Sequence, residues 1–246
     1  MNPSRASHPR WFYSIASILM LIITFTGFQL FYLEGKAFPG RPLTPPIRPL
    51  LITHGVLMTV WMLLAVAQPI LVAAGRKRLH MTLGRLGAVL AVGIVVTGWR
   101  LGVAAARLTP PEMRFFGLTP KEFMAVPVAG VVVFGLFVLA GVILRRRPDA
   151  HRPMMLMASL SAVAAALGRF PSLNALYAGS MWEQVFTAFF TMVALGAVFL
   201  IVKCLLARAF DRWFALAFAC LAASSVVISL GCKTSAWDSF ASFLLR

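Results

Sequence analysis

Long apolar stretches recur along this chain and constrain its fold more than any other feature. A helix needs about 20 mostly apolar residues to cross the roughly 30 Å hydrocarbon core of a bilayer. Seven stretches meet that requirement, and they cover residues 11–33, 50–74, 82–106, 123–144, 154–171, 182–206 and 213–232. Backbone amides find no water inside a bilayer, so segments of this kind are helical. The sequence therefore predicts an all-α fold, a polytopic transmembrane bundle of about seven helices in a single integral membrane domain over residues 1–246.

The composition excludes a water-soluble domain. Charged residues make up 12% of the chain and apolar residues 60%, whereas a soluble domain has about 25% and 45–50%. A net charge of +16 would suit nucleic acid in a soluble protein, but in membrane proteins Lys and Arg gather in cytoplasmic loops beside anionic lipid. We expect the lipid bilayer, and not nucleic acid, to be the partner. Short loops and many apolar helix faces also suit association with other membrane-protein subunits.

Basic residues predict how the chain crosses the membrane. The N-terminal segment and the second, fourth and sixth loops hold 13 Lys and Arg residues, against 9 on the opposite side. Five of the seven acidic residues lie on that opposite side. The basic segment before the first span resembles the start of a signal peptide, but the apolar run is too long and no cleavage site follows. We expect a retained first helix, a cytoplasmic N-terminus and a C-terminus outside.

Three polar residues of the second span recur every seven positions: His54, Trp61 and Gln68. At 100° per residue they stay within about 40° of one another and form one stripe on the helix. The stripe either belongs to ordinary packing and hydrogen bonding between helices, or it lines a cofactor or substrate site inside the bundle.

His80 and His151 each follow a basic cluster and open the next span. Both imidazoles should therefore lie at one depth near the cytoplasmic surface. Histidines from two facing helices are a common means of holding a metal or haem in a bundle, so the pair predicts axial ligation of haem b iron. Arg152 and its basic neighbours would neutralise the propionates. Alternatively, each imidazole bonds lipid headgroups or caps its own helix.

Small residues follow both histidines along the same helix faces. We expect these faces to bring the third and fifth spans close together, either around a flat porphyrin or in plain helix packing. The residues are Gly84, Gly87 and Ala91 after His80, and Ala158, Ala162 and Ala165 after His151.

Arg100 and Arg169 lie in the outer halves of the third and fifth spans. An arginine inside a span costs about 2.5–3.5 kcal/mol at the bilayer centre, and less near an end. Snorkelling to the interface would relieve most of that cost. The functional alternative is an anion or quinone-oxygen site that both arginines form with His54.

These residues resemble the pattern of a bacterial family of polytopic membrane proteins known only as a domain of unknown function. The resemblance covers about residues 50–170 and implies a multi-pass protein of the bacterial cytoplasmic (inner) membrane, but no activity. The pattern consists of His54-Gly55, Gln68, Leu79-His80, Gly84-Arg85, His151-Arg152-x-Met154 and Arg169.

The architecture is also distantly similar to that of the ascorbate-reducible b-type cytochromes, which hold two haems in a four-helix core. That resemblance implies that His80 and His151 form the inner ligand pair and that His54 is one outer ligand. The span at 123–144 contains no histidine to complete the outer pair, so the resemblance implies one inner haem.

Electron transfer through haem b near the cytoplasmic face is therefore the function that the sequence favours. Two alternatives stay open: a non-catalytic structural or assembly subunit of a larger membrane complex, and a small-molecule binder or transporter using the His54, Trp61 and Gln68 stripe. The spans contain no acidic pair, and the chain shows no Ser–His–Asp set or phosphate-binding loop. The sequence thus predicts no catalytic residues of its own.

Overall fold

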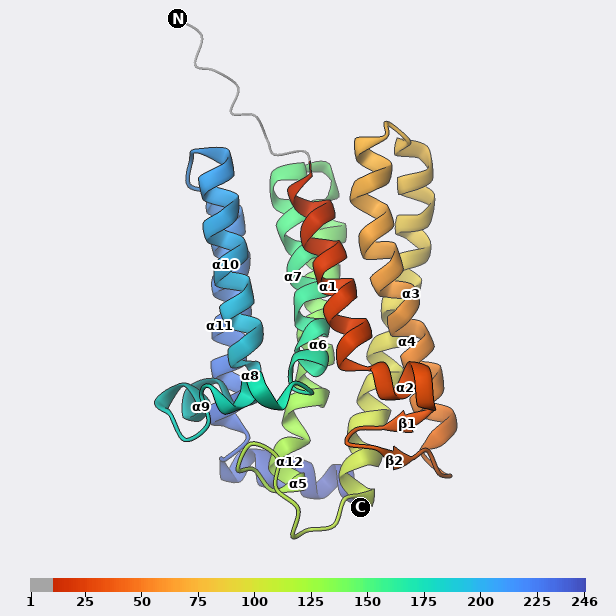
Figure 1. Ribbon diagram of the computed structural model, residues 1–246, viewed down its shortest axis with the longest axis vertical. Helices are drawn as coiled ribbons and strands as arrows, with labels where there is room; N and C mark the ends of the chain where they lie inside the picture. The colour runs from red at the N-terminus through yellow and green to blue at the C-terminus, as the bar shows by residue number, and fades with distance from the viewer. Residues whose placement is uncertain (1–10) are drawn as a thin grey trace, which may run out of the picture.

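Most of the chain runs back and forth along one axis as helices. A computed structural model describes residues 11–246, so the basic residues before the first helix lie outside the described part. Figure 1 shows the long helices side by side, with the start of α1 at the end opposite to the C-terminus. These helices are α1 (Phe12–Gly27), α3 (Arg48–Ala73), α4 (Lys77–Leu108), α6 (Ala125–Ile143), α7 (Pro148–Leu167), α10 (Phe190–Ala207) and α11 (Arg212–Gly231).

Shorter elements join or cover the long helices. An antiparallel pair of two-residue strands, β1 (Lys36–Ala37) and β2 (Arg41–Pro42), follows the first helices. The short helices are α2 (Gln29–Glu34), α5 (Pro120–Phe123), α8 (Pro171–Ala175), α9 (Met181–Phe186) and α12 (Ser235–Leu245), with single 3₁₀ turns η1 (Leu144–Arg146) and η2 (Thr187–Phe189).

The all-α prediction and the multi-pass membrane character are supported by five helical segments that are long and apolar enough to cross a bilayer. They span Arg48–Ala73, Lys77–Leu108, Pro120–Arg146, Met181–Ala207 and Arg212–Gly231.

The prediction of one continuous helix over residues 11–33 is wrong. The chain turns at Phe28, and α1 has 16 residues, or about 24 Å at 1.5 Å per residue. The predicted fifth span, 154–171, also differs, because α7 starts at Pro148 and ends at Leu167. Its first turns carry Asp149 and His151. α7 packs against α1, α6, α10 and α11, so neighbouring helices surround it.

The predicted sixth span, 182–206, is interrupted. α9 and η2 precede α10, and the backbone at Thr187 has a φ of 49°. A positive φ is costly for a β-branched residue, because its Cβ crowds the backbone. The sequence gives no glycine or proline at this position to signal the break.

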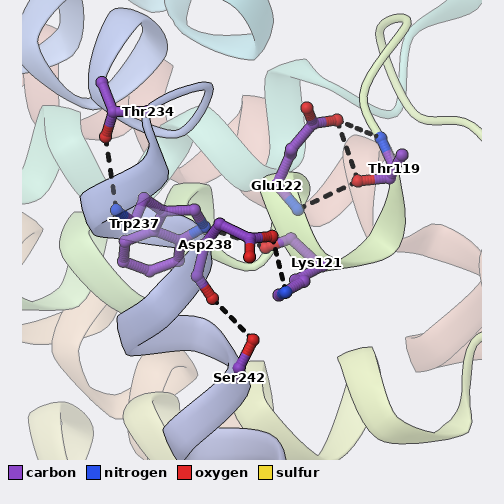
Figure 2. Close-up of polar contacts among 7 residues, drawn as sticks. All are labelled: Thr119, Lys121, Glu122, Thr234, Trp237, Asp238 and Ser242. Atoms are coloured by element: carbon purple, nitrogen blue, oxygen red, sulfur yellow. Dashed lines mark hydrogen bonds and ion pairs between the residues drawn. The ribbon is translucent and has the colours of Figure 1, made fainter.

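α12 was not predicted, and it lies across the end of the bundle against α4 and α5 (Figure 1). Figure 2 shows how it is attached: Lys121 and Asp238 form an ion pair at 2.5 Å, and Trp237 lies beside them. The Trp237 indole N–H donates to the Lys121 carbonyl at 3.0 Å. A capping box of Thr119 and Glu122 fixes the start of α5. The C-terminal helix therefore closes the end of the bundle opposite to the start of α1.

The expected close packing of the third and fifth spans is wrong. α4 packs against α3 and α6, and α7 packs against α6 and α1, so α4 and α7 share no extended interface. The glycines of α4 after Gly84 receive side chains from these neighbours. A Cβ on Gly98 would lie 2.6 Å from Val131 Cγ1 and 2.9 Å from His54 Cε1. These glycines thus serve the α3–α4 and α4–α6 contacts.

This packing predicts different results for two glycine substitutions on one helix. Gly98→Ala should lower the free energy of unfolding by about 1–3 kcal/mol, because the added methyl group overlaps His54 and Val131. Gly84→Ala should have little effect, because no atom lies within 4 Å of its added Cβ. An SDS titration in mild detergent, followed by helical circular dichroism, measures both. Equal stabilities for the two variants would contradict the packing described.

Candidate functional site

His80 and His151 are brought together at one end of the bundle. His80 lies in the first turn of α4 and His151 in the first turn of α7, so both helices begin at the same end (Figure 1). The ring centres are 6.4 Å apart and the ring planes are perpendicular, at 90°. α4 and α7 share no extended interface, but the His80 and His151 rings bring their first turns together.

The distance between the rings restricts what can connect them. Two imidazoles joined by a direct N–H···N bond have ring centres about 5 Å apart, because the bond contributes about 3 Å and each ring about 1 Å. Two imidazoles on one metal ion, with N–metal bonds of about 2.0–2.1 Å, have centres about 6 Å apart. The observed 6.4 Å is too long for the direct bond and close to the value for a shared metal.

A backbone carbonyl orients the His151 ring. The Nδ1–H of His151 donates to the Gly141 carbonyl of α6 at 2.7 Å, since a carbonyl oxygen can only accept. The proton of the neutral ring is then on Nδ1, and Nε2 keeps its lone pair. Metal-binding histidines are usually oriented by such a bond from the other ring nitrogen.

The side chain of Gln68 contacts the His80 ring. Its amide lies against three groups of α4: Nδ1 of His80, the His80 carbonyl oxygen at 3.2 Å and the Gly84 N–H at 3.2 Å. With the amide nitrogen toward the two acceptors and its oxygen toward the Gly84 N–H, every contact is complementary. In that orientation Gln68 donates to Nδ1 of His80.

The helix face that follows His80 carries two glycines and lies beside Gln68 and Leu64 of α3. Gly84 is exposed and Gly87 is buried, with only the Leu64 side chain, at 3.7 Å, near a Cβ on Gly87. Arg152 follows His151 and is half-buried. A planar group beside the two imidazoles would therefore meet little side-chain bulk on α4 and a cation on α7.

The other two members of the α3 stripe also face neighbouring helices. His54 donates from Nδ1 to Thr97 Oγ1 at 2.9 Å, since the Thr97 hydroxyl donates to the Gly93 carbonyl at 2.7 Å. Trp61 is 4% exposed, and its indole N–H donates to Ser159 Oγ at 3.3 Å. These contacts account for both residues as packing and hydrogen bonding inside the bundle.

Arg100 and Arg169 do not join His54 in the described structure. Arg100 is exposed on α4. The Arg169 guanidinium lies 4.0 Å from the centre of the Phe28 ring and donates to the Ala165 carbonyl. A cation over an aromatic ring explains its position at the end of α7.

Sequence reasoning missed the groups that orient the histidines. The Gly141 carbonyl is backbone and has no signal in the sequence. Thr97 and Ser159 are ordinary helix residues whose roles depend on helix packing. Gln68 was recognised as part of a stripe, but its partner His80 could not be derived from that stripe.

Within residues 11–246 no group of three or more His, Cys, Asp or Glu side chains could hold a metal ion. Comparisons of the chain with protein-family models, curated proteins and solved structures found no match. The candidate site is therefore defined by its geometry.

The contacts of Trp61 predict a structural role that mutation can measure. Trp61→Ala should lower the free energy of unfolding by about 3–5 kcal/mol, because it removes a buried ring. That ring packs edge-on against Phe134, with the two ring centres 4.8 Å apart. Trp61→Phe should cost less, since it keeps much of the ring packing. Trp182→Ala, at a side chain that is 48% exposed, is the control in the same SDS titration. A Trp61→Ala protein as stable as the control would contradict the packing role.

Proposed function

We propose that this protein is a membrane electron carrier that binds one haem b between His80 and His151. The observation that carries the proposal is the 6.4 Å separation of the two ring centres, with α4 and α7 not in extended contact. His151 supports it further, because its Nδ1–H bond to Gly141 leaves Nε2 free as a ligand.

The number of protein ligands favours haem over a bare metal ion. A structural or catalytic zinc site uses at least three protein ligands, and no such group occurs among the described residues. Haem supplies four equatorial nitrogens itself and needs only axial ligands from the protein. Two imidazoles at this spacing are sufficient for that one group.

The bound group would supply one-electron chemistry, and the chain would hold and tune it. At Gly84 and Gly87 α4 contributes no side chain that a flat ring would have to displace. Arg152 and the basic residues at the starts of α4 and α7 suit carboxylates, because guanidinium pairs with them in a planar fork. Trp61 and Phe134 fill the bundle interior and exclude water there.

We infer further that α1 and α7 also cross the membrane, which gives seven spans with the N-terminus in the cytoplasm. Neither is one of the five segments that are long and apolar enough to cross, but Figure 1 shows both helices running alongside those segments. The excess of basic residues at the histidine end supports a cytoplasmic site in a bacterial inner membrane. The interruption at Thr187 would suit a small-molecule binder, but it lies at the end opposite to the histidine pair.

Absorption spectroscopy tests the haem proposal. Protein purified in detergent from haem-replete cells should give a dithionite-reduced spectrum of low-spin haem b. His80→Ala and His151→Ala should each abolish that spectrum, because one axial ligand is lost. His54→Ala should keep it. A colourless wild-type preparation would overturn the proposal.

Reporter fusions test the topology. A reporter fused after Arg212 should lie in the cytoplasm and one fused at Arg246 outside, because α11 crosses between them. If both reporters indicate the cytoplasm, the seven-span arrangement is wrong.

A further inference from the structure

Gln68 contacts the His80 ring with a side chain that can either donate or accept a hydrogen bond. An amide presents a donor nitrogen and an acceptor oxygen, and a half-turn exchanges them. The orientation of Gln68 therefore decides what the Nδ1 atom of His80 meets. His151 has no such freedom, because its partner is the Gly141 carbonyl, which only accepts.

Each amide orientation fixes one protonation pattern of a neutral His80. If the Gln68 nitrogen donates to Nδ1, the ring proton is on Nε2 and His80 offers an N–H. If the Gln68 oxygen accepts from Nδ1–H, Nε2 keeps its lone pair and can bind a metal.

The contacts with α4 favour the first orientation in the metal-free protein. In it the amide nitrogen also donates to the His80 carbonyl, and the amide oxygen accepts from the Gly84 N–H, each at 3.2 Å. In an α-helix that carbonyl and that N–H already bond each other, so the loss of the extra contacts costs little. A strong bond between metal and Nε2 can therefore reverse the amide.

We propose that Gln68 is a positioning residue that selects the protonated nitrogen of His80: its amide places the proton on Nε2 in the metal-free protein and turns over to accept from Nδ1–H when Nε2 binds iron. Without metal, Nε2 of His80 thus carries a proton while Nε2 of His151 keeps its lone pair. With metal, both Nε2 atoms present lone pairs. The metal-bound half of this inference rests on the proposed haem site; the metal-free half does not.

Ring ¹⁵N NMR of the haem-free, ¹⁵N-histidine-labelled protein tests the metal-free half. Wild-type His80 should carry its proton on Nε2 and His151 on Nδ1. Gln68→Glu should move the His80 proton to Nδ1, because a carboxylate only accepts, and Gln68→Met should leave a mixture of both forms. His151 should be unchanged in each variant, which also reports correct folding. Identical His80 ring shifts in all three proteins would overturn the proposal.

Haem titration and redox potentiometry test the metal-bound half. Gln68→Met should weaken haem binding about 10–100-fold, as loss of a hydrogen bond to a ligating histidine typically does. Gln68→Glu should retain haem and shift its midpoint potential to more negative values, because a carboxylate makes the imidazole a stronger electron donor. Gln184→Met and Gln184→Glu, at an exposed glutamine of α9, are matched controls and should change neither quantity.

The two tests separate the possible failures. A wild-type protein that binds no haem refutes the proposed function, while the NMR result still decides the role of Gln68 in the metal-free protein. Unchanged affinity and potential in both Gln68 variants, with haem bound, would refute Gln68 as a positioning residue for the ligand.

Discussion

The central position of α7 is the constraint on which the other helices depend. α7 packs against α1, α6, α10 and α11, and its middle and last turns are almost fully buried. A helix enclosed by other helices need not be apolar enough for lipid. Its polar residues Asp149, His151 and Arg152 lie at its start, where Asp149 is exposed. The same enclosure holds α7 against α6, where the Gly141 carbonyl orients the His151 ring. The packing of α7 among its neighbours thus sets both the position of this helix in the bundle and the orientation of the His151 ring.

α4 and α7 are not direct neighbours along their length, and the packing of α4 explains why. Its glycines admit side chains of α3 and α6, such as His54 and Val131 at Gly98. α4 therefore stands beside those two helices and across from α7. At the end where both helices begin, the His80 and His151 side chains bring them together. A planar ligand bound between the two imidazoles would therefore not have to separate an extended α4–α7 interface.

The sequence predicted well where most helices lie and at which end the two histidines lie, because both have local signals. Apolar length located most of the spans, and the positions of His80 and His151 after basic turns predicted that they share one end. Contacts between helices had no such signal. Small residues below both histidines predicted an α4–α7 interface, whereas the Gly98 face receives His54 and Val131. The break at Thr187 and the attachment of α12 through Trp237 depend on tertiary contacts, and no local pattern indicates them.

The perpendicular imidazole planes allow the most direct test of a haem between His80 and His151. The measurement is electron paramagnetic resonance of the oxidised, haem-loaded protein at low temperature. Planes at 90° predict a strongly anisotropic low-spin ferric signal, because perpendicular axial imidazoles leave the iron orbitals nearly degenerate. A high-spin signal, or the rhombic low-spin signal typical of nearly parallel imidazoles, would contradict ligation by this pair in the observed geometry.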